Sequence, residues 1–95
     1  MISEIAAEIR SWPTGYGFLV DQVKRASSSI LLNLAEGNNR RTAKDRRRFF
    51  NIAQGSAAEV SAILDVAWGF GIICAKSQME KKQELLEITK MISKL

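Results

Sequence analysis

The sequence predicts an all-α protein, an up-down-up-down antiparallel four-helix bundle with a short first helix. Three observations lead to this fold class. Apolar residues recur at spacings of three and four in four separate segments, the connections between these segments are short, and no segment alternates apolar and polar residues as a strand would. A chain of 95 residues suffices for one domain, so we expect residues 1–95 to form a single bundle.

The first predicted helix covers residues 1–12 and is amphipathic. Its apolar stripe consists of Ile2, Ile5, Ala6 and Ile9. Pro13 ends the helix, because proline disfavours helical backbone in the residue before it, and Gly15 and Gly17 supply the backbone freedom of a tight loop. We therefore expect a short connection to the next helix.

The second predicted helix spans about residues 18–36. Its stripe consists of Leu19, Val23, Ala26, Ile30 and Leu34. Gly37 follows directly and suits a left-handed C-terminal cap, a backbone conformation that glycine adopts without steric cost. Asn33 lies at the edge of the stripe, so we expect a partly buried amide that fixes the register of the helix.

The third predicted helix is the longest, at about 28 residues or ~42 Å. Thr42 is its expected N-cap, and Asp45 places a carboxylate beside the positive end of the helix dipole. Gly55 in its interior suggests close contact with another helix, and Gly69 with Gly71 marks its end. Its core stripe consists of Phe49, Ile52, Ala53, Ser56, Val60, Ile63, Leu64 and Ala67.

The fourth predicted helix runs from about residue 77 to residue 95. Its stripe consists of Leu85, Ile88, Met91, Ile92 and Leu95. Cys74, just before this helix, is expected to pack as an ordinary small hydrophobe.

Basic residues are concentrated at the corner between the second and third helices. Six of the 14 Lys and Arg residues lie within nine positions, against the single acid Asp45, whereas the other eight face nine acidic residues. The six are Arg40, Arg41, Lys44, Arg46, Arg47 and Arg48. The net charge of +4 is therefore a local excess, which is typical of a surface that binds a polyanion.

We expect these six residues to bind nucleic acid, with Lys24 and Arg25 as additional candidates. Because Phe49 is assigned to the core stripe, few aromatic rings are available to stack on bases, and binding should be dominated by the phosphate backbone and sensitive to salt. The six residues could also have no ligand, because runs of charge are often only solvated helix starts.

Several function classes are disfavoured by composition. Histidine is absent and Cys74 is the only cysteine, so the commonest general base, an internal disulfide and a cysteine-cluster zinc site are all missing. We expect no catalytic residue, no metal and no cofactor. No apolar run reaches the roughly 18 to 20 residues of a spanning helix, so we expect a cytoplasmic protein without a membrane partner.

Glu36 and Glu59 could form an acid pair, but carboxylates on neighbouring helices more often make ion pairs. We expect Glu36 to pair with Arg25.

Six apolar residues lie off the predicted core stripes: Leu31, Leu32, Phe50, Trp68, Met79 and Leu86. A chain this short buries only about 60 to 65% of its unfolded surface and is marginally stable alone. So many exposed apolar residues on a small domain are typical of an interface, and we expect them to join copies of the chain into a homo-oligomer.

One stretch resembles a known family. The residues that carry the resemblance are Ser29, Ile30, Asn33, Leu34, Ala35, Glu36 and Gly37, the pair Arg40 and Arg41, and then Phe50, Ile52, Ala53, Gly55, Ser56 and Glu59. Together they resemble the four-helix-bundle proteins encoded in 23S rRNA intervening sequences, which are related to the accessory variability determinant of diversity-generating retroelements. The resemblance covers residues 17–95.

This resemblance implies a homopentamer arranged as a basic barrel, RNA or DNA binding and, for the retroelement branch, a reverse-transcriptase partner. The chain departs from the family pattern in its short first helix. It also departs in carrying Leu31 and Leu32 where proline or small residues are expected.

These observations predict a non-enzymatic, oligomeric nucleic-acid-binding protein that uses the arginine-rich corner. RNA and DNA both remain open as ligands. The alternative is a protein-interaction or scaffold module whose apolar outer faces dock a larger partner such as a reverse transcriptase, with the arginines as specificity charges.

Overall fold

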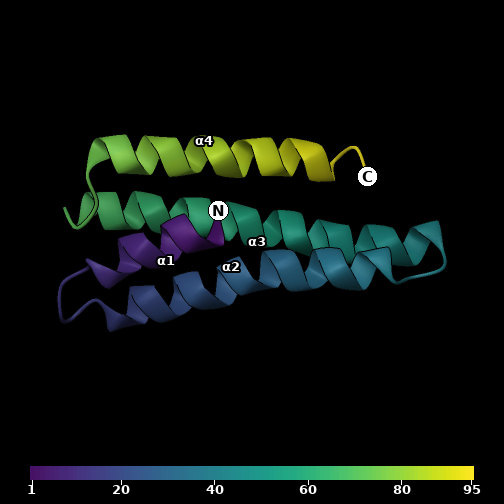
Figure 1. Cartoon of the computed structure of the whole chain (residues 1–95), viewed down its shortest axis with the longest axis horizontal. Helices are drawn as coiled ribbons and strands as arrows, with labels where there is room; N and C mark the ends of the chain where they lie inside the picture. The colour runs from purple at the N-terminus through teal and green to yellow at the C-terminus, as the bar shows by residue number, and fades with distance from the viewer.

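The computed structural model describes all residues from 1 to 95. It contains four helices and no strand: α1 (Ile2–Arg10), α2 (Gly17–Asn38), α3 (Ala43–Gly69) and α4 (Ala75–Ile92). Each helix runs antiparallel to the one before it (Figure 1). The predicted up-down-up-down four-helix bundle with a short first helix is therefore confirmed.

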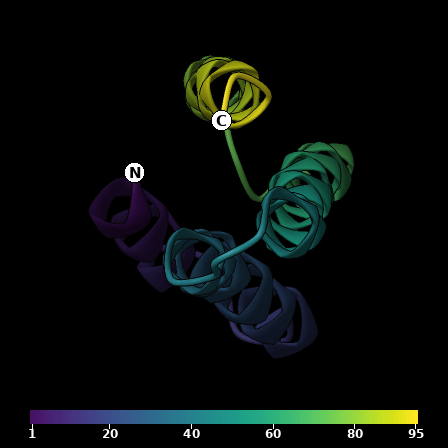
Figure 2. The same cartoon turned by 90° about the vertical axis from the view of Figure 1, so that its right-hand side faces the viewer.

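The molecule is elongated, with extents of 44 × 22 × 19 Å. The end-on view in Figure 2 shows α1 beside α2 and α4 beside α3. The contact between α2 and α3 is the most extensive in the fold. Because α1 has 9 residues and α2 has 22, α1 covers less than half the length of its neighbour. None of the four helices combines the length and apolar composition that crossing a bilayer requires.

The main core lies between α2 and α3. Its largest fully buried side chains are Val23 and Ile30 from α2 and Val60 and Leu64 from α3, all on predicted stripes. Ile52 was also predicted to be in the core, but it is 46% exposed because its face of α3 turns to solvent.

The ends of α3 and α4 are set by local chemistry. Thr42 caps α3 as predicted, since its Oγ1 accepts a hydrogen bond from the backbone N–H of Asp45 at 3.1 Å. The helix ends at Gly69, and Gly71 has a φ of 75°, where glycine is favoured. α4 begins earlier than predicted because exposed Cys74 is its N-cap, with Sγ accepting from the N–H of Ser77. The predicted packing role of Cys74 is therefore wrong.

Gly37 does not form the predicted left-handed cap. α2 continues through it to Asn38, and Gly37 is buried without a positive φ. A Cβ atom here would lie 2.5 Å from Cε1 of Phe50, so the missing side chain makes room for that ring. Phe50 is consequently only 4% exposed, and its assignment to an oligomer interface is wrong.

A smaller core cluster lies where α3 begins and α4 ends. Phe50 packs there with Ala53 and Ile92. This contact brings the C-terminal end of α4 to the corner between α2 and α3.

Asn33 is partly buried, as predicted, but its amide bonds within α2 and Ser29 makes the polar contact with α3. The amide of Asn33 donates to the carbonyl oxygen of Ser29 at 2.8 Å and to the Oγ of Ser29 at 3.0 Å. The same Oγ lies 2.7 Å from the Oγ of Ser56 on α3. Gly55 is not part of this contact, because it is exposed and a Cβ atom there would meet nothing within 4 Å. Its predicted role in tight packing is wrong.

α1 is tied to α4 by a polar cluster. Glu8 accepts hydrogen bonds from Nε1 of Trp12 at 2.9 Å and from Oγ of Ser77 at 2.8 Å. Lys81 donates to the same Ser77 Oγ at 2.8 Å and lies 3.8 Å from Glu8 Oε1. The cluster joins the end of α1 to the start of α4, and both lie at the end of the bundle away from the α2–α3 connection (Figure 1).

Candidate nucleic-acid interface

The basic corner is the group of six predicted ligand-binding residues at the connection between α2 and α3. All six are exposed, and they occupy the connection and the first two turns of α3: Arg40, Arg41, Lys44, Arg46, Arg47 and Arg48. The corner forms one end of the long axis of the molecule (Figure 1). The cap at Thr42 fixes where α3 begins, so the four cations inside the helix project from a regular backbone.

Five of the six cations have no carboxylate partner. Only Arg40 forms an ion pair, with its Nη2 atom 2.7 Å from Oε2 of Glu36 one turn earlier. The remaining ion pairs of the chain lie elsewhere. Arg46 instead donates to the carbonyl oxygen of Arg41 at 3.2 Å, which leaves its charge uncompensated. The corner therefore presents a positive surface to solvent.

Phe49 organises part of this surface. Its ring lies under two guanidinium groups, with the Cζ of Arg40 at 4.7 Å from the ring centroid and the Cζ of Arg48 at 4.8 Å. Phe49 was predicted to point into the core, but it is only half-buried, and its neighbour Phe50 takes the core position.

Two further cations, Lys90 and Lys94, lie at this end of the molecule and were not predicted from the sequence. Both are exposed and without an ion pair, and they flank Ile92, which packs against Phe50 at the start of α3. The C-terminus of α4 and the α2–α3 connection both face the viewer in Figure 2. A signal was available in the sequence, because α2 and α4 of an up-down-up-down bundle end on the same side.

Lys24 and Arg25 do not join the basic corner. They lie about 20 Å before the end of α2, at 1.5 Å per residue. Arg25 instead contacts Glu59 on α3, with Nη2 at 3.4 Å from Oε1. The predicted pairing of Glu36 with Arg25 is wrong, because eleven residues of helix separate the two by about 16 Å.

The other predicted interface residues are exposed on different sides of the bundle. Leu31 and Leu32 on α2 are 53% and 66% exposed, and Met79 and Leu86 on α4 are 69% and 47% exposed. Trp68 near the end of α3 is 53% exposed. An aromatic group in which Tyr16 contacts Phe18 and Phe70 lies at the end opposite the basic corner, and sequence reasoning missed it.

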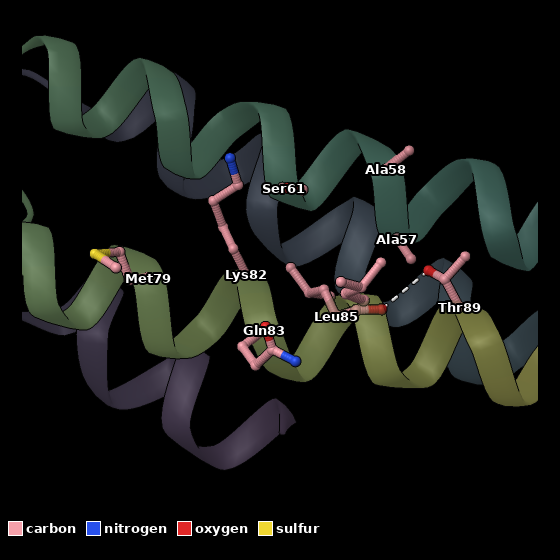
Figure 3. Close-up of a pocket in the computed structure, with 9 residues that line it drawn as sticks. Ala57, Ala58, Ser61, Met79, Lys82, Gln83, Leu85 and Thr89 are labelled. Carbon is pink, nitrogen blue, oxygen red and sulfur yellow. Dashed lines mark hydrogen bonds between the residues drawn. The ribbon is translucent and has the colours of Figure 1, made fainter.

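A groove of about 520 Å³ runs between α3 and α4. Its α3 side is formed by the small residues Ala57, Ala58 and Ser61, and its α4 side includes Met79 and Leu86. Figure 3 shows Lys82 crossing from α4 toward α3 in this groove, where its Nζ lies 2.8 Å from Oδ1 of Asp65. Two of the predicted interface residues therefore line one concave apolar surface.

Comparison with known families gives one match. The family model described as "23S rRNA-intervening sequence protein" matches residues 3–94. No curated protein matches the chain.

Proposed function

Because this chain belongs to the family of 23S rRNA-intervening sequence proteins, we propose that it is a non-enzymatic, oligomeric nucleic-acid-binding protein of the cytoplasm that uses the basic corner. One observation carries the proposal. Five of the six cations at the corner are exposed and have no carboxylate within 4 Å.

The ligand of such a surface is the phosphate backbone. Five of the six residues are arginines, whose planar group can donate two parallel hydrogen bonds to one phosphate. The aromatic rings beside them are poorly placed for base stacking, since Phe50 is buried and Phe49 already contacts two guanidinium groups. Binding that depends mainly on phosphates releases counterions and weakens steeply as salt rises.

Self-association would multiply this surface. A ring of copies, the homopentamer implied by the family resemblance, would present several basic corners to one nucleic acid, so that weak phosphate contacts add through avidity. The exposed residues Leu31, Leu32, Trp68, Met79 and Leu86 are the proposed contacts between copies.

The experiment is a titration of the purified protein with structured RNA and with duplex DNA at several salt concentrations. We expect the triple variant Arg41→Gln, Lys44→Gln, Arg47→Gln to lose about tenfold or more in affinity at moderate salt. Its slope of log affinity against log salt should shrink by ~0.7 to 0.9 for each phosphate that the variant no longer neutralises.

A matched control removes the same charge elsewhere. Arg10, Lys24 and Lys76 are exposed cations without ion pairs, and changing all three to glutamine should change affinity much less. An equal loss in both triple variants, or affinity that does not depend on salt, would contradict the proposal.

The groove between α3 and α4 favours a second candidate function. Its apolar lining suits a helix of a larger protein partner, such as the reverse transcriptase that the family resemblance implies for the retroelement branch. Under this alternative, Met79→Ser with Leu86→Ser would abolish capture of the purified partner, whereas the corner variant would leave it intact.

A further inference from the structure

Two arginines of the basic corner share one aromatic ring. Arg40 comes from the connection before α3 and Arg48 from the second turn of α3, yet both guanidinium carbons lie within 5 Å of the Phe49 centroid, at 4.7 and 4.8 Å. Like charges repel, and the face of an aromatic ring attracts each of them, which offsets part of that repulsion.

The ring contact leaves the arginines able to bind. A guanidinium group that lies over an aromatic ring uses its face, whereas its N–H donors point outward in its plane. A carboxylate partner would occupy those donors instead. Arg48 has no such partner, and Arg40 gives one donor group to Glu36 at 2.7 Å.

We propose that Phe49 is a positioning residue that pre-organises Arg40 and Arg48 for the phosphodiester backbone of nucleic acid. The proposal rests on the proposed function and adds to it the residue that sets the geometry of the contact. Free arginine side chains lose rotamer freedom when they bind, and a ring that restricts them beforehand lowers that cost. Because the ring already contacts two guanidinium groups, we expect it not to stack on a base, so the contact should not distinguish one base from another.

The test compares variants at Phe49 in titrations with uridine and adenosine homopolymer RNA. We expect Phe49→Leu and Phe49→Met to weaken binding of both RNAs by about 5- to 30-fold, the loss from releasing two restrained side chains. Phe49→Tyr keeps the aromatic face and should retain the affinity of the unchanged protein. The salt slope should stay the same in all three variants, because no charge is removed.

Double-mutant cycles separate positioning from a general effect on folding. Arg48→Gln should cost less in the Phe49→Leu background than in the unchanged protein, because Arg48 is already released there. Arg47 is the matched control, since it is adjacent in sequence and has no ring contact, and its substitution should cost the same in both backgrounds. Helix content by circular dichroism confirms that each variant is folded.

The outcomes distinguish this proposal from the one it rests on. If the unchanged protein binds neither these homopolymers nor the structured RNA and duplex DNA named above, both proposals fail. If it binds only the structured RNA or the duplex DNA, the same Phe49 variants are compared on that ligand. If it binds and Phe49→Leu and Phe49→Met bind equally well, or if Arg47 and Arg48 couple to Phe49 to the same extent, only the positioning role is overturned. A preference for one homopolymer that disappears in Phe49→Leu would show that the ring stacks on bases, and would also overturn it.

Discussion

At the residue scale, one missing side chain decides how the start of α3 packs. Gly37 lies within α2 without a positive φ, so the position does not require the backbone freedom of glycine. The absence of a side chain leaves space for the ring of Phe50, which is almost completely buried in the small core cluster. With Phe50 in the core, the preceding residue Phe49 is turned about 100° around the helix, toward the arginines.

We therefore predict opposite effects from alanine at two helical glycines. Gly37→Ala should lower the free energy of unfolding by about 1 to 3 kcal/mol, because the new Cβ atom overlaps the buried ring of Phe50, which must shift within the core. Gly55→Ala should raise it by up to ~1 kcal/mol, because that site is open and alanine favours helix. Urea denaturation measures both. Stabilisation by both substitutions would contradict the packing role of Gly37, and Phe50→Leu should relieve the cost of Gly37→Ala.

At the element scale, α4 is attached to the rest of the bundle partly by polar contacts. Asp65 on α3 accepts hydrogen bonds from Nε2 of Gln78 at 2.7 Å and from Nζ of Lys82 at 2.8 Å. Farther along, Nε2 of Gln54 donates to the carbonyl oxygen of Thr89 at 3.2 Å. The contact of α4 with α3 is less extensive than that of α2 with α3, so these bonds matter for the position of the helix.

The Asp65 contact predicts a pH dependence. The hydrogen bond from Lys82 lowers the pKa of Asp65 below its ordinary value of 3.8. The Asp65 carboxylate therefore binds a proton less readily in the folded protein than in the unfolded chain. Its contribution to the free energy of unfolding is complete above pH 3.8 and is lost as the pH falls through the lowered pKa. Since the pair is exposed, the contribution should be only about 0.5 kcal/mol.

The measurement is urea denaturation between about pH 6 and pH 2.5. Asp65→Asn should show a smaller loss of stability at acid pH than the unchanged protein. Asp21→Asn changes an exposed aspartate without an ion pair and is the control. If both variants follow the acid profile of the unchanged protein, Asp65 has no such role.

At the scale of the whole molecule, charge and apolar surface occupy different places. The basic corner forms one end of the 44 Å axis, whereas Leu31 and Leu32 lie on the side of α2 and the groove lies between α3 and α4. The apolar sides can thus be covered by neighbouring copies while the basic ends stay in solvent. Two different apolar faces suit a heterologous contact, which closes into a ring when the rotation between copies permits.

We predict that the protein self-associates through these sides. Light scattering at micromolar concentration should give a mass well above that of one chain. Leu31→Ser with Leu32→Ser should shift the mass toward the monomer, because it removes two exposed apolar side chains of the proposed contact. Val66→Ser, at an exposed apolar residue outside that contact, should leave the mass unchanged. A monomer in the unchanged protein would refute the prediction.

The sequence by itself determined the four helices, their antiparallel order, the cap at Thr42 and the concentration of cations at one corner. These features depend on residues close in the chain: apolar spacing, a capping side chain, a proline and the order of charges. The tertiary structure alone decided that Phe50 rather than Phe49 is buried and that Arg25 on α2 pairs with Glu59 on α3. The physical reason is that adjacent residues of a helix point about 100° apart, so a broad apolar face allows several rotations, and only the neighbouring helices select one.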